Sequence, residues 1–87
     1  METKFVYVVT INEVNDCESA VHLPNVFENE KDALHFLKEC YDDAKEDYKQ
    51  YYTDMIYGFY VTSAEIYQNN DWTNTHWEIA MYKVPLH

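Results

Sequence analysis

The segment between residues 33 and 55 most constrains the fold, because its apolar residues recur at spacings of three and four. That period places them on one side of an α-helix. Asn29 lies just before this segment, with Asp32 three residues later, and a capping side chain followed by acids is typical of a helix start. The sequence therefore predicts an amphipathic helix of about six turns, about 35 Å long, that must bury one side. Its apolar stripe consists of Ala33, Leu37, Cys40, Ala44, Tyr48, Tyr51 and Met55, widened by Leu34, Tyr41 and Tyr52.

Extended segments are expected on both sides of this helix. Residues 5–11 are β-branched and aromatic with apolar residues at both parities, which is typical of a central strand or of one covered on both faces. Residues 20–27 resume an extended pattern around Pro24, which predicts a short edge strand because proline cannot donate to a ladder. After Gly58, residues 59–67 and 76–84 predict two more strands, with a loop at 68–75 between them.

These elements follow one another in the order ββαββ. Two hairpins separated by a helix predict a mostly antiparallel sheet with the long amphipathic helix packed on one face, a two-layer α+β sandwich. The chain has 87 residues, which suffice for one hydrophobic core and not for two. We therefore expect a single domain over residues 1–87.

Charge narrows the possible partners. The chain carries 16 acids and 6 lysines, has no arginine, and has a formal net charge of −10. Arginine is the usual bidentate ligand of phosphate, so direct nucleic-acid binding and docking on an anionic membrane are not expected. A protein of this charge is attracted to basic surfaces, and large basic surfaces commonly hold nucleic acid. The alternative, that the acidity only maintains solubility, stays open.

The first residues lack the charged-then-apolar pattern of an export signal, and no apolar run approaches the length of a membrane span. A cytoplasmic location is expected, which would be the host cytoplasm if the chain is phage-encoded. Thiols stay reduced there, so no disulfide is predicted between Cys17 and Cys40.

The pattern of residues does not favour catalysis, and no cofactor is expected. With one glycine the chain has no phosphate-binding loop. Cys40 falls on the apolar stripe, and Cys17 lies beside two acids that would raise the pKa of its thiol, so neither suits a nucleophile. His76 and Glu78 would share one strand face, but two ligands without a third at a diagnostic spacing do not predict a metal site. We therefore predict a non-enzymatic protein.

The acidic side of the helix is the most informative feature. Acids lie four residues apart in three like-charged pairs, an arrangement that costs a few tenths of a kcal/mol per pair in an isolated helix. Stability alone would not favour it. A solvated surface and a docking surface for a basic partner both remain open. The candidate residues are Glu39, Asp42, Asp43, Glu46 and Asp47.

Nine tyrosines and two tryptophans are too many for a small core to bury completely. Trp72 lies in the expected loop and Tyr67 at the end of the strand before it. Tyrosine and tryptophan recur at recognition surfaces because they give large contact area with few torsions to freeze. We therefore predict Trp72 and Tyr67 as a second candidate binding patch, while Trp77, Ile79 and Met81 are expected to face the helix.

A small acidic ββαββ chain without arginine, with the segment VFENEKDA at 26–33 leading into its helix, resembles the short accessory proteins of bacteriophages and mobile elements. These include acidic anti-CRISPR and other anti-defence inhibitors, many of which imitate nucleic acid. The resemblance lies in size, charge and element order over the whole chain. It implies a protein that blocks a nucleic-acid-binding host factor by occupying its basic site.

Two functional hypotheses follow. The first is an inhibitor or regulator that docks on a basic protein surface, in the way that a nucleic-acid mimic would. The alternative is a small-molecule-binding or self-associating domain, a possible homodimer, that uses the open sheet face and the Trp72 loop. Salt separates them, because a charge-driven complex weakens as ionic strength rises whereas an apolar interface hardly changes.

Overall fold

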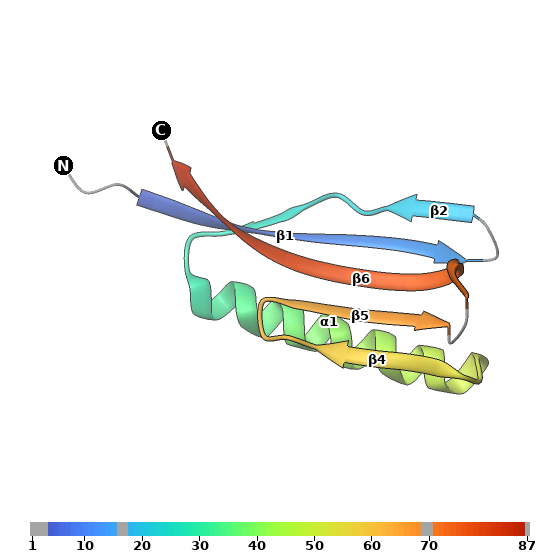
Figure 1. The fold of residues 1–87 in the computed structure, drawn as a ribbon. Coiled ribbons are helices and arrows are strands. Elements are labelled where there is room, and N and C mark those ends of the chain that lie inside the picture. Colours follow the sequence, from blue (N-terminus) through green and yellow to red (C-terminus); the bar gives the residue numbers. More distant parts are fainter. Residues whose placement is uncertain (1–3, 16–17, 69–70, 87) are drawn as a thin grey trace.

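One long helix divides the chain into two groups of strands in the computed structural model, which describes residues 4–15, 18–68 and 71–86 and, for residues 15, 18–21 and 71–74, the backbone alone (Figure 1). Before the helix come β1 (Lys4–Asn15), β2 (Glu18–Val21) and β3 (Asn25–Phe27). The helix is α1 (Glu30–Tyr51), and β4 (Met55–Phe59), β5 (Ser63–Gln68) and β6 (Asp71–Leu86) follow it.

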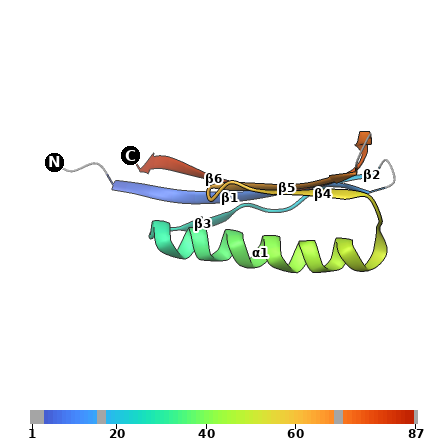
Figure 2. The ribbon, with the colours of Figure 1, turned by 60° about the horizontal axis from the view of Figure 1, so that its bottom comes forward.

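The strands form one antiparallel sheet in the order β2-β1-β6-β5-β4. Strand β3 also pairs with β1, on the same edge as β2: β2 pairs with the C-terminal part of β1 and β3 with residues 7–9 nearer its N-terminus. In the described part of the chain, α1 packs along one face of the sheet and no element covers the other (Figure 2). The predicted fold class, an α+β layer of antiparallel strands with one long helix on one face, is confirmed.

The core lies between α1 and the sheet because side chains alternate between the two faces of each strand. Val9 of β1, Ile66 of β5 and Ile79 of β6 point toward the helix and are buried, as is Leu37 of α1. Trp77 is buried and Met81 partly so, both packed on this side as the sequence predicted. Cys40 and Ala44, expected to be buried with Leu37, are only partly buried against the core.

The helix begins where the sequence predicted and ends at Tyr51, four residues before the end of the predicted apolar stripe. The Asn29 side chain accepts a hydrogen bond from the Lys31 amide at 2.8 Å and so caps the first turn. At the other end, Tyr52 has left the helical conformation and Asp54 adopts a left-handed one (φ 59°), which aspartate tolerates better than most residues. Met55 therefore belongs to β4 rather than to α1, although it still packs on the core.

Strand bounds differ from the predicted ones where the chain gave weak or no turn signals. The predicted edge strand at 20–27 is interrupted around Pro24 and becomes β2 and β3, both at the edge of the sheet beside β1. The predicted strand at 59–67 is instead the turn and second strand of the β4–β5 hairpin, with Gly58 inside β4. The predicted loop at 68–75 is wrong for residues 71–75, whose backbone already belongs to β6.

The β4–β5 turn strains its central residue. The Thr62 amide donates to the Tyr60 carbonyl at 2.9 Å across Val61, which has a φ of 71°. This i→i+2 turn with a positive central φ is rare, and a β-branched side chain fits it poorly. The turn is nevertheless held in place, since the Met81 amide of β6 donates to the Thr62 carbonyl at 2.8 Å.

Val61→Gly is therefore expected to stabilise the fold by about 1 kcal/mol, because relief of strain outweighs the extra freedom of glycine in the unfolded chain. Urea unfolding of both proteins measures the difference. Thr62→Gly, one residue along and without a positive φ, is the control and should lose stability. Equal losses in the two variants would contradict a strained Val61.

Candidate functional site

The acidic candidates on α1 all remain on the surface. Asp43, Glu46 and Asp47 are exposed, and the side chains of Glu39 and Asp42 are 63% and 55% exposed. Two of the five have a basic neighbour one turn away. The His35 imidazole lies 3.2 Å from the Glu39 carboxylate, and the Lys38 ammonium lies 3.2 Å from that of Asp42.

Three of the four lysines of α1 lie on a different side of the helix from most of these acids, and the fourth, Lys31, is in its first turn. Lys38, Lys45 and Lys49 recur at spacings of seven and four, so they form one stripe. The Lys38 ammonium lies 5.4 Å from the centre of the Phe59 ring, and those of Lys45 and Lys49 each lie 5.6 Å from that of Tyr57. These cation–π contacts hold the lysine stripe against β4.

The remaining exposed surface of the helix is acidic. Glu39, Asp43, Glu46 and Asp47, which we name the acidic flank, extend from the edge of the lysine stripe, where Glu46 is three residues before Lys49, to the side of α1 that carries Phe36. The Phe36 ring packs 5.2 Å from Phe27 of β3, so this flank lies toward the β1–β3 side of the sheet. All six lysines are among the described residues, and none forms an ion pair with a member of the acidic flank.

The predicted aromatic patch is not joined to the acidic flank. Tyr67 follows the buried Ile66 in β5 and therefore points to the sheet face away from α1, where it is opposite His76 of β6. Trp72 was predicted to lie in a loop, but its backbone is in β6 and its side chain lies outside the described residues. Tyr67 and the acidic flank cannot therefore contact the same flat partner surface together.

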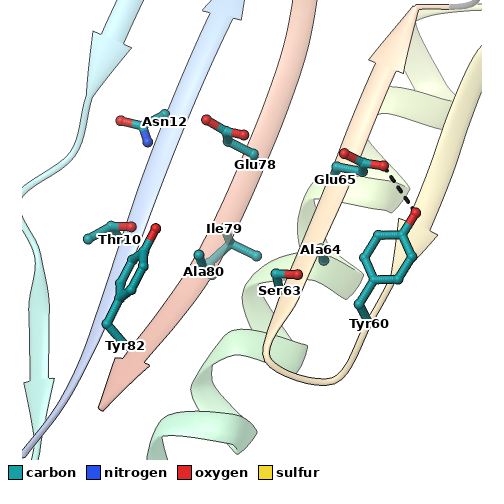
Figure 3. Close-up of a pocket in the computed structure, with 10 residues that line it drawn as sticks. All are labelled: Thr10, Asn12, Tyr60, Ser63, Ala64, Glu65, Glu78, Ile79, Ala80 and Tyr82. Carbon is teal, nitrogen blue, oxygen red and sulfur yellow. Dashed lines mark hydrogen bonds between the residues drawn. The ribbon is translucent and has the colours of Figure 1, made fainter. Parts of the chain in front are cut away.

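The open face of the sheet carries a small polar pocket of about 150 Å³ that the sequence did not indicate (Figure 3). Glu65 of β5 and Glu78 of β6 are direct neighbours in the strand register, and Asn12 of β1 follows in the same row. Like charges directly opposite on adjacent strands destabilise a sheet. No lysine forms an ion pair with either glutamate. Tyr60 and Tyr82 lie at opposite sides of the pocket.

Tyr60 explains the position of the one glycine. The Tyr60 hydroxyl donates to the Glu65 carboxylate at 3.1 Å, which raises the pKa of the Tyr60 hydroxyl because the protonated form is the donor. To reach Glu65 the ring crosses Gly58, where an added Cβ would lie 2.7 Å from the hydroxyl oxygen. Any other residue at position 58 would have to displace the ring.

Nothing in the described residues assembles into a recognisable catalytic or metal centre. Cys40 lies on α1, on the other side of the sheet from the Glu65–Glu78 pocket. Burial raises the pKa of its thiol, with further increases from Asp43 and Glu39, which disfavours the reactive thiolate. Cys17, which the sequence also disfavours as a nucleophile, lies outside the described residues. No three His, Cys, Asp or Glu side chains in the described part of the chain are placed to share a metal ion.

Comparison with protein-family models, with curated proteins and with solved structures found no match for the chain. Within the described residues, no helix has the combination of length and apolar character that a membrane span requires.

Proposed function

We propose that the chain is a non-enzymatic binding protein that docks its acidic flank on a basic protein surface of the kind that holds nucleic acid. The segregation of charge on α1 supports this most directly. A helix that only needed solubility could intersperse its lysines among its acids, and alternating pairs would stabilise it. Here Lys38, Lys45 and Lys49 lie over aromatic rings of β4, and no lysine forms an ion pair with a member of the acidic flank, whose one basic neighbour is His35 beside Glu39.

Geometry adds a second argument. The acids of the flank lie at positions 39, 43, 46 and 47, within about two and a half turns of the 22-residue α1, so they form a short band of exposed negative charges on a rigid element. A line of carboxylates can take the place of phosphates in a basic groove, and such charge complementarity gives both attraction and register. The partner would be a nucleic-acid-binding host factor, as the likeness to anti-defence inhibitors implies.

Two variants with the same change in charge test the proposal. Asp43→Asn with Glu46→Gln removes two of the four charges of the acidic flank, and Glu65→Gln with Glu78→Gln removes both carboxylates of the pocket on the open sheet face. The partner is first isolated on the immobilised wild-type chain, eluted with salt and identified by mass. The flank variant is expected to bind it about tenfold more weakly or worse, because both steering and direct contacts are lost.

The open-face variant should bind as tightly as wild type, and nucleic acid should compete with the wild-type chain for the partner. Equal weakening of the two variants would mean that only net charge matters. Weakening of the open-face variant alone would favour the alternative function, in which the Glu65–Glu78 pocket binds a ligand or a second copy.

A further inference from the structure

Where the end of the acidic flank meets the sheet, α1 borders a second cavity, of about 680 Å³. Its lining combines two aromatic rings from the last turns of α1 and one from Tyr52, the residue after the helix, with two carboxylates, one from the helix and one from β1. The tyrosine–acid cavity is lined by Glu13, Asp47, Tyr48, Tyr51 and Tyr52. Asp47 belongs to both the acidic flank and this cavity, so the two surfaces are continuous.

One wall of the cavity holds a buried polar group with nothing to bind. Tyr48 is 6% exposed, and its hydroxyl oxygen is buried without a hydrogen-bond partner in the described part of the chain. Burial raises the pKa of Tyr48 to about 12, with further contributions from Glu13 and Tyr52. The charge of Glu13 therefore lies near enough to raise the pKa of the hydroxyl, although Glu13 accepts no hydrogen bond from it. A buried hydroxyl left in this state is costly unless a ligand uses it.

The electrostatics of the cavity favour a cation. Glu13 and Asp47 supply carboxylates, and the C-terminal end of α1 adds the negative end of the helix dipole. Tyr48 and Tyr52 are stacked with ring centres 5.3 Å apart, and Tyr51 is 74% exposed beside them, so aromatic faces border the charge. None of the residues that line the cavity is basic. The His22 imidazole approaches Glu13 to 3.8 Å from outside the lining.

We propose that this cavity binds the guanidinium group of an arginine side chain presented by the basic partner. A guanidinium has five donors in a plane, which suits two carboxylates, an unpartnered hydroxyl and flanking aromatic rings together. Lysine offers a compact ammonium that cannot stack in this way. The chain itself contains no arginine that could occupy the cavity. The inference rests on the proposed function, since it adds one specific contact to the docking of the acidic flank.

The probe is N-acetyl-arginine-methylamide, and its neutral citrulline counterpart is the control ligand. Both are titrated against the full chain while the amide and tyrosine-ring signals are followed by NMR. We expect millimolar binding of the arginine probe, with the largest shifts at Tyr48, Tyr51 and Tyr52, and little response to the citrulline probe. Tyr48→Phe retains the ring and should weaken binding about tenfold, as expected for loss of one hydrogen bond to a charged donor. Glu13→Gln should weaken it similarly.

The open-face variant, Glu65→Gln with Glu78→Gln, should bind the arginine probe as wild type does. Equal affinity for the arginine and citrulline probes would overturn the guanidinium site, and so would undiminished binding by both Tyr48→Phe and Glu13→Gln. Neither result affects the acidic flank, which the Asp43 and Glu46 replacements test with the partner itself. If the Asp43 and Glu46 replacements leave partner binding unchanged while the cavity still binds the arginine probe, the proposed function is rejected and the arginine site is retained.

Discussion

Leu37→Ala is expected to destabilise the fold by about 2 to 5 kcal/mol, because it removes a fully buried side chain and leaves a cavity. Leu37 lies in the middle of α1 and belongs to the one buried cluster that joins helix and sheet, with Val9, Ile66 and Ile79. An 87-residue domain has about 5 to 10 kcal/mol of stability in all, so this loss is a large fraction of it.

The same substitution at an exposed position provides the control. Leu23 is 89% exposed between β2 and β3, and Leu23→Ala should change stability by less than about 0.5 kcal/mol. Urea unfolding of the two variants and wild type gives the comparison. A loss below about 1 kcal/mol at Leu37 would show that α1 does not bury this stripe against the sheet.

Tyr48→Phe is expected to alter the dependence of stability on alkaline pH. The pKa of Tyr48 is raised in the folded protein to about 12 from the 10.0 of a free side chain, so the unfolded chain loses this proton first. The group therefore contributes its full stability below pH 10 and loses it as pH rises toward 12. A shift of two pKa units corresponds to about 3 kcal/mol, of which about half should be lost by pH 11.

The phenylalanine variant lacks this titration, so its advantage over wild type should grow by about 1 kcal/mol between about pH 8 and about pH 11. At neutral pH it should be at least as stable as wild type, because it removes a buried hydroxyl without a partner. Tyr51→Phe, at an exposed ring of the same turn, is the control and should follow wild type at both pH values. Parallel pH curves for all three proteins would contradict a buried Tyr48 hydroxyl.

Local signals in the sequence were enough to predict the helix, its Asn29 cap and the face that it buries. The repeat of three and four residues depends only on helix geometry, and Leu37 is buried as it indicated. Trp77 and Ile79, which alternate along the last strand, are also buried as expected. The turns were harder to place. Val61 forms a tight turn without glycine, proline or asparagine, and the β6 backbone runs through residues 71–75, where the β5–β6 register shifts between the Gln68–Asp71 and Tyr67–His76 pairs.

The surfaces depend on tertiary placement and so were only partly predictable. The spacing in the sequence identified the five acids. It could not show that Lys45 and Lys49 contact the Tyr57 ring, because that contact depends on where β4 packs beside the helix. Tyr67 was predicted as part of a second binding patch, and strand alternation places it on the sheet face away from the acids. The tyrosine–acid cavity had a partial signal, since Tyr48, Tyr51 and Tyr52 follow one another at spacings of three and four residues in the sequence. Its second half, Glu13, comes from a strand distant in sequence.

The salt dependence of partner binding tests the central claim most directly. Wild type, the Asp43→Asn, Glu46→Gln variant and the Glu65→Gln, Glu78→Gln variant are each titrated against the isolated partner at about 0.05 M and about 0.5 M salt. If the acidic flank meets a basic groove, wild type and the open-face variant should lose affinity steeply with salt, and the flank variant should lose markedly less. Equal affinities and equal salt dependence in wild type and the flank variant would contradict the account and leave the acidic flank an ordinary solvated surface.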